Sequence, residues 1–90
     1  MAVEVRIPTI LRTYTGGAKA VDGDAGTLAE VIDSVESGYP GIKDRIIEGT
    51  DLRRFINVYV NDEDVRFLSG LDTAVADGDV VVVLPAVAGG

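Results

Sequence analysis

The sequence predicts a single α+β domain in which a mixed sheet of four to five strands has one main helix packed on one face. Three observations lead to this fold class: short segments alternate between apolar and polar residues, one amphipathic helix interrupts them, and the last strand is apolar at every position. A chain of 90 residues, 47% of them hydrophobic, is long enough for one compact core and too short for two.

The first expected strand covers residues 2–8, and its apolar face consists of Val3, Val5 and Ile7. Alternation with a period of two is typical of a half-buried strand. Gly16 and Gly17 provide a turn, after which a second short strand is expected at residues 19–21. The two strands therefore form a hairpin with a long loop.

The main helix is expected to begin after Thr27, because Thr27 and Glu30 have the spacing of a capping box. Its apolar stripe consists of Leu28, Val31, Ile32 and Val35. Gly38, Pro40 and Gly41 end the helix. Residues 42–47 are expected to form only a helical turn, and residues 48–52 a surface loop.

The second half of the chain predicts three more strands. A central strand is expected at residues 55–60, a short strand at residues 65–67 that pairs back on it, and a last strand at residues 80–84 that Pro85 ends. Residues 71–75 and 77–79 form the intervening turns. The acidic run at residues 62–64 lacks the ligand spacing of a calcium loop, so no metal site is expected.

This order of elements is that of a ubiquitin-like β-grasp, in which the first and last strands are parallel neighbours at the centre of the sheet. Central parallel strands are typically apolar along their length, as the run at residues 80–84 is, but the outward-facing members of this run need a second explanation. Because one helix covers only one face, alternation assigns Val81 and Val83 to the core. The open face then carries Val80, Val82 and Leu84. Val82, Leu84 and the adjoining Pro85 form the expected partner-binding surface.

Composition excludes most chemistry known in small domains. The chain contains neither Cys nor His, so zinc ribbons, disulfide frameworks and Ser-His or Cys-His catalysis are excluded. Its net charge of -7 argues against nucleic acid as a partner. No segment has the pattern of a membrane span or a secretion signal. We therefore expect a cytoplasmic protein that binds no membrane, is not an enzyme and is a monomer when free.

The final residues form the most distinctive segment. Residues 85–90 contain no charged and no bulky side chain, and they end in Gly89 and Gly90. Glycine lacks a Cβ atom, so such a segment can enter a narrow active-site channel. We therefore expect a β-grasp domain at residues 1–84 and a flexible tail at residues 85–90. Val87, Ala88 and Gly89 would thread partner active sites, and the Gly90 carboxylate would be the functional group.

Residues 55–66 and 85–90 resemble the ThiS/MoaD family of ubiquitin-like sulfur carriers, and the resemblance spans the chain. Residues 7–12, 15–17, 61–66 and the tail are most similar to the CysO-type carrier of cysteine biosynthesis. This resemblance implies that an E1-like adenylyltransferase and sulfurtransferase activates Gly90 with ATP. A sulfur donor then displaces AMP and leaves a thiocarboxylate at Gly90.

The resemblance also implies the later partners. A pyridoxal-phosphate cysteine synthase would supply the acceptor, and a metal-dependent peptidase would release cysteine. ATP, pyridoxal phosphate and the metal belong to those enzymes, so the chain itself is expected to bind no cofactor. In agreement, it has no G-x-x-x-x-G-K-[ST] loop for ATP. Without a cysteine, transferable sulfur has no site other than Gly90.

Four alternatives remain open at this stage. The small subunit of molybdopterin synthase has a similar tail, whereas thiamine-type carriers are usually shorter and lack the pattern of residues 61–66. A protein modifier would end in an isopeptide bond from Gly90 to a lysine. A plain β-grasp binding module would keep its function after deletion of Gly89 and Gly90.

Overall fold

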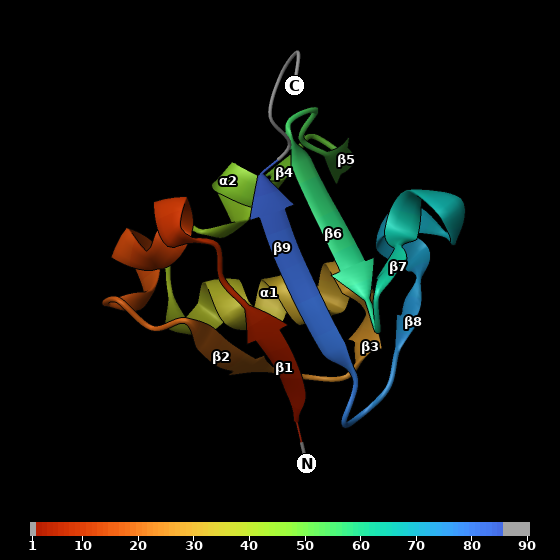
Figure 1. Ribbon diagram of the computed structural model, residues 1–90, viewed down its shortest axis with the longest axis horizontal. Helices are drawn as coiled ribbons and strands as arrows, with labels where there is room; N and C mark the ends of the chain where they lie inside the picture. Colours follow the sequence, from red (N-terminus) through yellow and green to blue (C-terminus); the bar gives the residue numbers. More distant parts are fainter. Residues whose placement is uncertain (1, 86–90) are drawn as a thin grey trace.

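The computed structural model describes residues 2–85, which form a five-stranded sheet with the helix α1 (Leu28–Gly38) packed across one face (Figure 1). The strand order is β2-β1-β9-β6-β7. These strands are β1 (Val3–Arg6), β2 (Ala20–Gly23), β6 (Ile56–Val60), β7 (Glu63–Asp64) and β9 (Val80–Pro85). The predicted ubiquitin-like β-grasp, with a mixed sheet and one main helix, is thereby confirmed.

Short elements complete the described part of the chain. Two small two-stranded sheets pair β3 (Gly26–Thr27) with β8 (Ala74–Val75) and β4 (Ile47–Glu48) with β5 (Asp51–Leu52). One further α-helical turn is α2 (Lys43–Ile46). The 3₁₀ helices are η1 (Thr9–Thr15), η2 (Val65–Phe67) and η3 (Gly70–Asp72).

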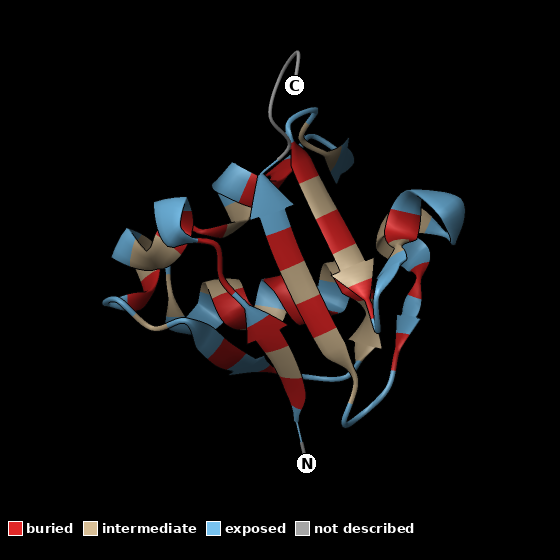
Figure 2. Cartoon of the chain, viewed as in Figure 1, coloured by how far each residue is buried: buried red, intermediate tan, exposed pale blue. Residues whose placement is uncertain are grey.

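The strand β9 is at the centre of the sheet. It pairs in parallel with β1, where Val5 lies opposite Val81, and antiparallel with β6, where Val58 lies opposite Val83. Val81 and Val83 are 0% and 1% exposed, whereas Leu84 is 44% exposed. Figure 2 shows this alternation along β9 and β6. The predicted inward and outward faces of the last strand are correct.

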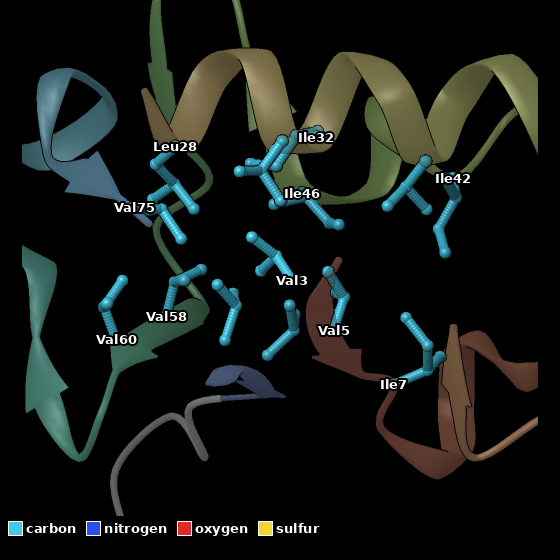
Figure 3. Packing of buried hydrophobic residues seen from close by; sticks show 14 of the residues in the cluster. Val3, Val5, Ile7, Leu28, Ile32, Ile42, Ile46, Val58, Val60 and Val75 are labelled. Atoms are coloured by element: carbon cyan, nitrogen blue, oxygen red, sulfur yellow. The ribbon is translucent and has the colours of Figure 1, made fainter. Parts of the chain in front are cut away.

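The core lies between α1 and the sheet. Leu28, Val31, Ile32 and Val35 are the buried residues of α1, as the spacing of the apolar stripe predicts. In Figure 3 the side chains of Leu28 and Ile32 point toward those of the strands, which include Val3, Val5 and Val58. The capping box is formed: Thr27 Oγ1 accepts a hydrogen bond from the N–H of Glu30, and Glu30 Oε1 accepts one from the N–H of Thr27.

The short return strand after β6 lies earlier in the chain than predicted. The segment that pairs with β6 is β7, and residues 65–67 form the 3₁₀ helix η2 instead. Asn61 and Asp62 both have positive φ, 49° and 72°, which makes a two-residue turn and lets pairing resume at once at Glu63. Asp64 then accepts a hydrogen bond from the N–H of Arg66 and so caps η2.

Other boundaries also differ from prediction. The predicted surface loop at residues 48–52 contains the β4-β5 hairpin, whose turn places Gly49 at a φ of 64°. The long loop of the first hairpin contains η1, and its second strand is β2, one residue later than predicted at its start and two at its end. Pro85 belongs to β9 and lies opposite Ile56, because its missing N–H does not prevent pairing at the end of a strand.

Glu36 joins the end of α1 to α2. Its carboxylate accepts hydrogen bonds from the backbone N–H of Gly41 at 2.9 Å and from that of Lys43 at 2.9 Å. These bonds, first from Gly41 and then from Lys43, lower the pKa of Glu36 below its usual 4.5. The carboxylate therefore stabilises the fold above its unfolded-state pKa, and this contribution is lost as the pH falls through the folded-state pKa.

We predict that Glu36→Gln lowers the free energy of unfolding at neutral pH and that its difference from the parent chain shrinks as the pH falls below about 4.5. Urea titrations between neutral pH and pH about 3 measure this difference. Glu63→Gln is the matched control, since the exposed Glu63 side chain accepts no hydrogen bond within residues 2–85. An equal loss at every pH would contradict the role given to the charge.

The alternation of β9 predicts opposite effects for two neighbouring substitutions. Val83→Glu places a carboxylate in the core and should cost about 3 kcal/mol or more, enough to unfold much of the population. Leu84→Glu should change stability by less than about 1 kcal/mol, because this side chain is on the open face. Thermal melts of both variants test the register. Collapse of Leu84→Glu alone would show that the faces are reversed.

Candidate functional site

The C-terminal end of β9 extends past its parallel neighbour. The pairing with β1 ends where Arg6 lies opposite Val82. Beyond that point, Val83, Leu84 and Pro85 pair only with β6 within residues 2–85. One edge of the final three residues of β9 is therefore free of a neighbouring strand in the described structure.

A hollow of about 450 Å³ lies at this free edge. On one side it is lined by Val82, Leu84 and Pro85, the three residues predicted to bind a partner. A smaller hollow of about 230 Å³, lined partly by Tyr59 and Asp62, lies against the same Val82 and Leu84. The structure thus brings the three predicted surface residues together. The side chains of Val82 and Leu84 lie between two depressions, where a partner can contact them.

The opposite wall of the larger hollow is the segment that leaves β1. Pro8 comes directly before η1. The C=O of Pro8 accepts a hydrogen bond from the N–H of Leu11 at 2.9 Å and so helps to form this helix. Leu11 and Thr15 are each 5% exposed and anchor η1 on the core, whereas Ile10 is 62% exposed. The helix is fixed by its buried face and leaves an apolar side chain in solvent beside the end of β9.

Three cations also line this hollow, and none of them was a predicted site residue: Arg6, Arg12 and Lys19. Arg12 Nε donates a hydrogen bond to the C=O of Ile7 at 3.1 Å. Lys19 is brought close because its C=O accepts a hydrogen bond from the N–H of Ile7 at 2.8 Å. No sequence pattern points to these cations, because they come together only in the folded chain.

The remaining predicted site residues lie outside the described residues. These are Gly90, predicted to carry sulfur, and Val87, Ala88 and Gly89, predicted to thread partner active sites. Within residues 2–85 no group of His, Cys, Asp and Glu side chains has an arrangement that could hold a metal ion. Over the same part of the chain, no helix has the length and hydropathy needed to cross a membrane.

Comparison with known proteins identifies a family and its carrier role. Residues 5–90 match the ThiS family. The sulfur carrier protein CysO of Mycobacterium tuberculosis is 56% identical, with 100% of both chains covered. A crystal structure of the BexX/CysO complex of Amycolatopsis orientalis contains a chain that is 61% identical and superposes with a TM-score of 0.94, covering 99% of this chain and 100% of that chain.

A third relative is named as a modifier protein and not as a sulfur carrier. The small archaeal modifier protein 3 of Haloferax volcanii is 39% identical, again with 100% of both chains covered. All three relatives extend over the whole β-grasp domain described above, and the Mycobacterium tuberculosis relative is named a sulfur carrier protein. This chain therefore belongs to the ThiS family, and it is a sulfur carrier with a β-grasp fold rather than an enzyme.

Proposed function

We propose that the Gly90 carboxylate is the group that carries sulfur and that the carrier supplies cysteine biosynthesis. The single observation that carries this proposal is the 56% identity to a CysO sulfur carrier over the full length of both chains. The match to the ThiS family also extends through Gly90. The end of β9 supports the proposal physically, because a strand held in the sheet up to Pro85 gives a partner a fixed surface next to the final residues.

The chemistry requires a partner enzyme. A carboxylate at neutral pH resists nucleophiles, whereas an acyl adenylate is readily attacked. We propose that an E1-like adenylyltransferase and sulfurtransferase transfers AMP from ATP to Gly90. A sulfur donor then displaces AMP, so that the carboxylate oxygen is replaced by sulfur. The product is an anionic thioacid, which is as soft a nucleophile as a thiolate.

The proposed acceptor is an aminoacrylate held by a pyridoxal-phosphate cysteine synthase. The thiocarboxylate sulfur adds to the acceptor, and an S-to-N acyl shift leaves cysteine in amide linkage to Gly90. A metal-dependent peptidase would hydrolyse this amide and restore the carboxylate. ATP, pyridoxal phosphate and the metal are assigned to these partners, and we place the whole cycle in the cytoplasm.

Intact-mass spectrometry tests the proposal directly. After incubation with ATP, an E1-like enzyme and a sulfur donor, the parent chain should gain the mass of one oxygen-to-sulfur exchange. Gly90→Ala should load more slowly, because a Cβ atom narrows the fit in a channel shaped for glycine. Deletion of Gly89 and Gly90 is the negative control. An unchanged mass of the parent chain would contradict the proposal, and equal loading of Gly90→Ala would contradict its steric part.

A second candidate is protein modification, which the identity to a small archaeal modifier protein favours. In this function the activated Gly90 carboxylate would form an isopeptide bond with a lysine of a target protein. The same mass measurement separates the two functions when a cysteine synthase with its substrate is added. A cysteinyl adduct supports the carrier of cysteine biosynthesis, whereas adducts on target lysines support the modifier.

A further inference from the structure

The positive charges of this acidic protein are concentrated at one end. Three hollows share Ile10 in their lining, and together they are lined by six of the eight Lys and Arg residues of the chain. Glu48 is the only carboxylate in these linings among the described residues, although the chain contains 15 Asp and Glu. The cations are Arg6, Arg12, Lys19, Arg45, Arg53 and Arg54.

These hollows surround the end of β9. The elements that line them, η1, α2 and the segment after β5, lie at the end of the sheet toward which the β9 arrow points (Figure 1). We name the surface formed by Arg12, Lys19, Arg45, Arg53 and Arg54 around Ile10 the basic surface. It adjoins Leu84 and Pro85, and so it begins where the described chain ends.

Neutral oxygen atoms position several of these cations. Arg12 donates to the C=O of Ile7, and Arg53 Nε donates to the C=O of Asp44. Arg45 Nε donates to Tyr14 Oη at 2.6 Å, and its guanidinium lies 5.7 Å from the centre of the Tyr14 ring. These contacts fix the side chains without cancelling their charge.

Ion pairs cancel little of the charge of this surface. Within residues 2–85 the carboxylate contacts of Lys and Arg are Arg6 with Glu4, Lys43 with Asp33, and Arg53 with Glu48 at 3.7 Å. Only the last involves the basic surface. Its other four members form no ion pair within residues 2–85, in a chain whose net charge is -7. Such a local concentration of one sign steers an oppositely charged partner.

The centre of the basic surface is apolar. Ile10 and Phe55 are 62% and 56% exposed, and Leu84 at its margin is 44% exposed. Exposed isoleucine and phenylalanine side chains add no binding free energy for a free phosphate ion. A protein interface, in contrast, combines an apolar centre with arginines and a charged rim. The combination therefore favours a protein partner over a small anion or a nucleic acid backbone.

We propose that the basic surface docks on an acidic protein surface that surrounds the opening of the partner site that receives Gly90. Ile10, Phe55 and Leu84 fill apolar depressions there, and the surrounding cations orient the carrier before the tail enters. This inference rests on the carrier function proposed above and adds the chemistry of the partner surface. It predicts an association rate that falls as salt concentration rises.

Binding kinetics with the BexX protein of Amycolatopsis orientalis test this inference, since BexX forms a complex with the 61%-identical relative. The variant is Lys19→Gln with Arg54→Gln, because neither side chain makes a hydrogen bond within residues 2–85 that folding could lose. Lys43→Gln is the matched control for Lys19→Gln, because Asp33 already balances the charge of Lys43. Thermal melts verify that all variants remain folded.

At about 20 mM salt the association rate of the double variant should be at least about fivefold below that of the parent chain, and at about 500 mM salt the two rates should converge. Lys43→Gln should associate at nearly the parent rate. Equal rates at low salt, or absence of BexX binding by the parent chain, would overturn the inference. A third result would also overturn it: the parent chain binds RNA in a salt-sensitive way, and the double variant loses this RNA binding while it still binds BexX as the parent does.

Failure of the proposed function is detected separately. A parent chain that does not gain sulfur in the intact-mass measurement contradicts the carrier chemistry at Gly90, whatever the charges of Lys19 and Arg54. A parent chain that gains sulfur and binds BexX, together with a double variant that associates equally fast, contradicts only the docking inference.

Discussion

The parallel pairing of β9 with β1 is the interaction on which the other features of the molecule depend. It places a continuous apolar strand at the centre of the sheet, with β6 on its other edge and α1 over one face. Val81 and Val83 are buried in this position, between the neighbouring strands and under α1. Because the pairing with β1 ends at Val82, the same arrangement carries Leu84 and Pro85 past the neighbouring strand and exposes them beside η1.

The site is a consequence of how β1 ends. Pro8 turns the chain away from the sheet and into η1, whose buried Leu11 and Thr15 hold it in place. This turn brings Ile10 and Arg12 next to Leu84, although the two segments are more than 70 residues apart in the sequence. A carrier needs a surface that stays the same while its terminal group changes chemically. A strand paired in the sheet, bordered by an anchored 3₁₀ helix, provides such a surface.

Much of this architecture could be predicted from the sequence, because the strongest signals are periodic. Alternation of apolar and polar residues predicts the strands β6 and β9. The apolar stripe predicts the buried face of α1, and the capping box at Thr27 predicts where this helix begins. The β4-β5 hairpin and η2 could not be predicted, because segments of two or three residues have no period and depend on single φ angles at Gly49, Asn61 and Asp62. The basic surface was not predicted, because Arg12, Lys19 and Arg54 gather around Ile10 only in the folded chain.

Native-state hydrogen exchange measures whether β9 is a rigid base up to the end of the sheet. If it is, the amides of β9 that pair with β1 and β6 exchange only through global unfolding, with protection at least as high as that of Val35 in α1. The β9 amides could instead exchange through local opening, at rates well above those of α1. This result would show that the end of the sheet opens by itself, and it would contradict the role of β9 as a rigid base.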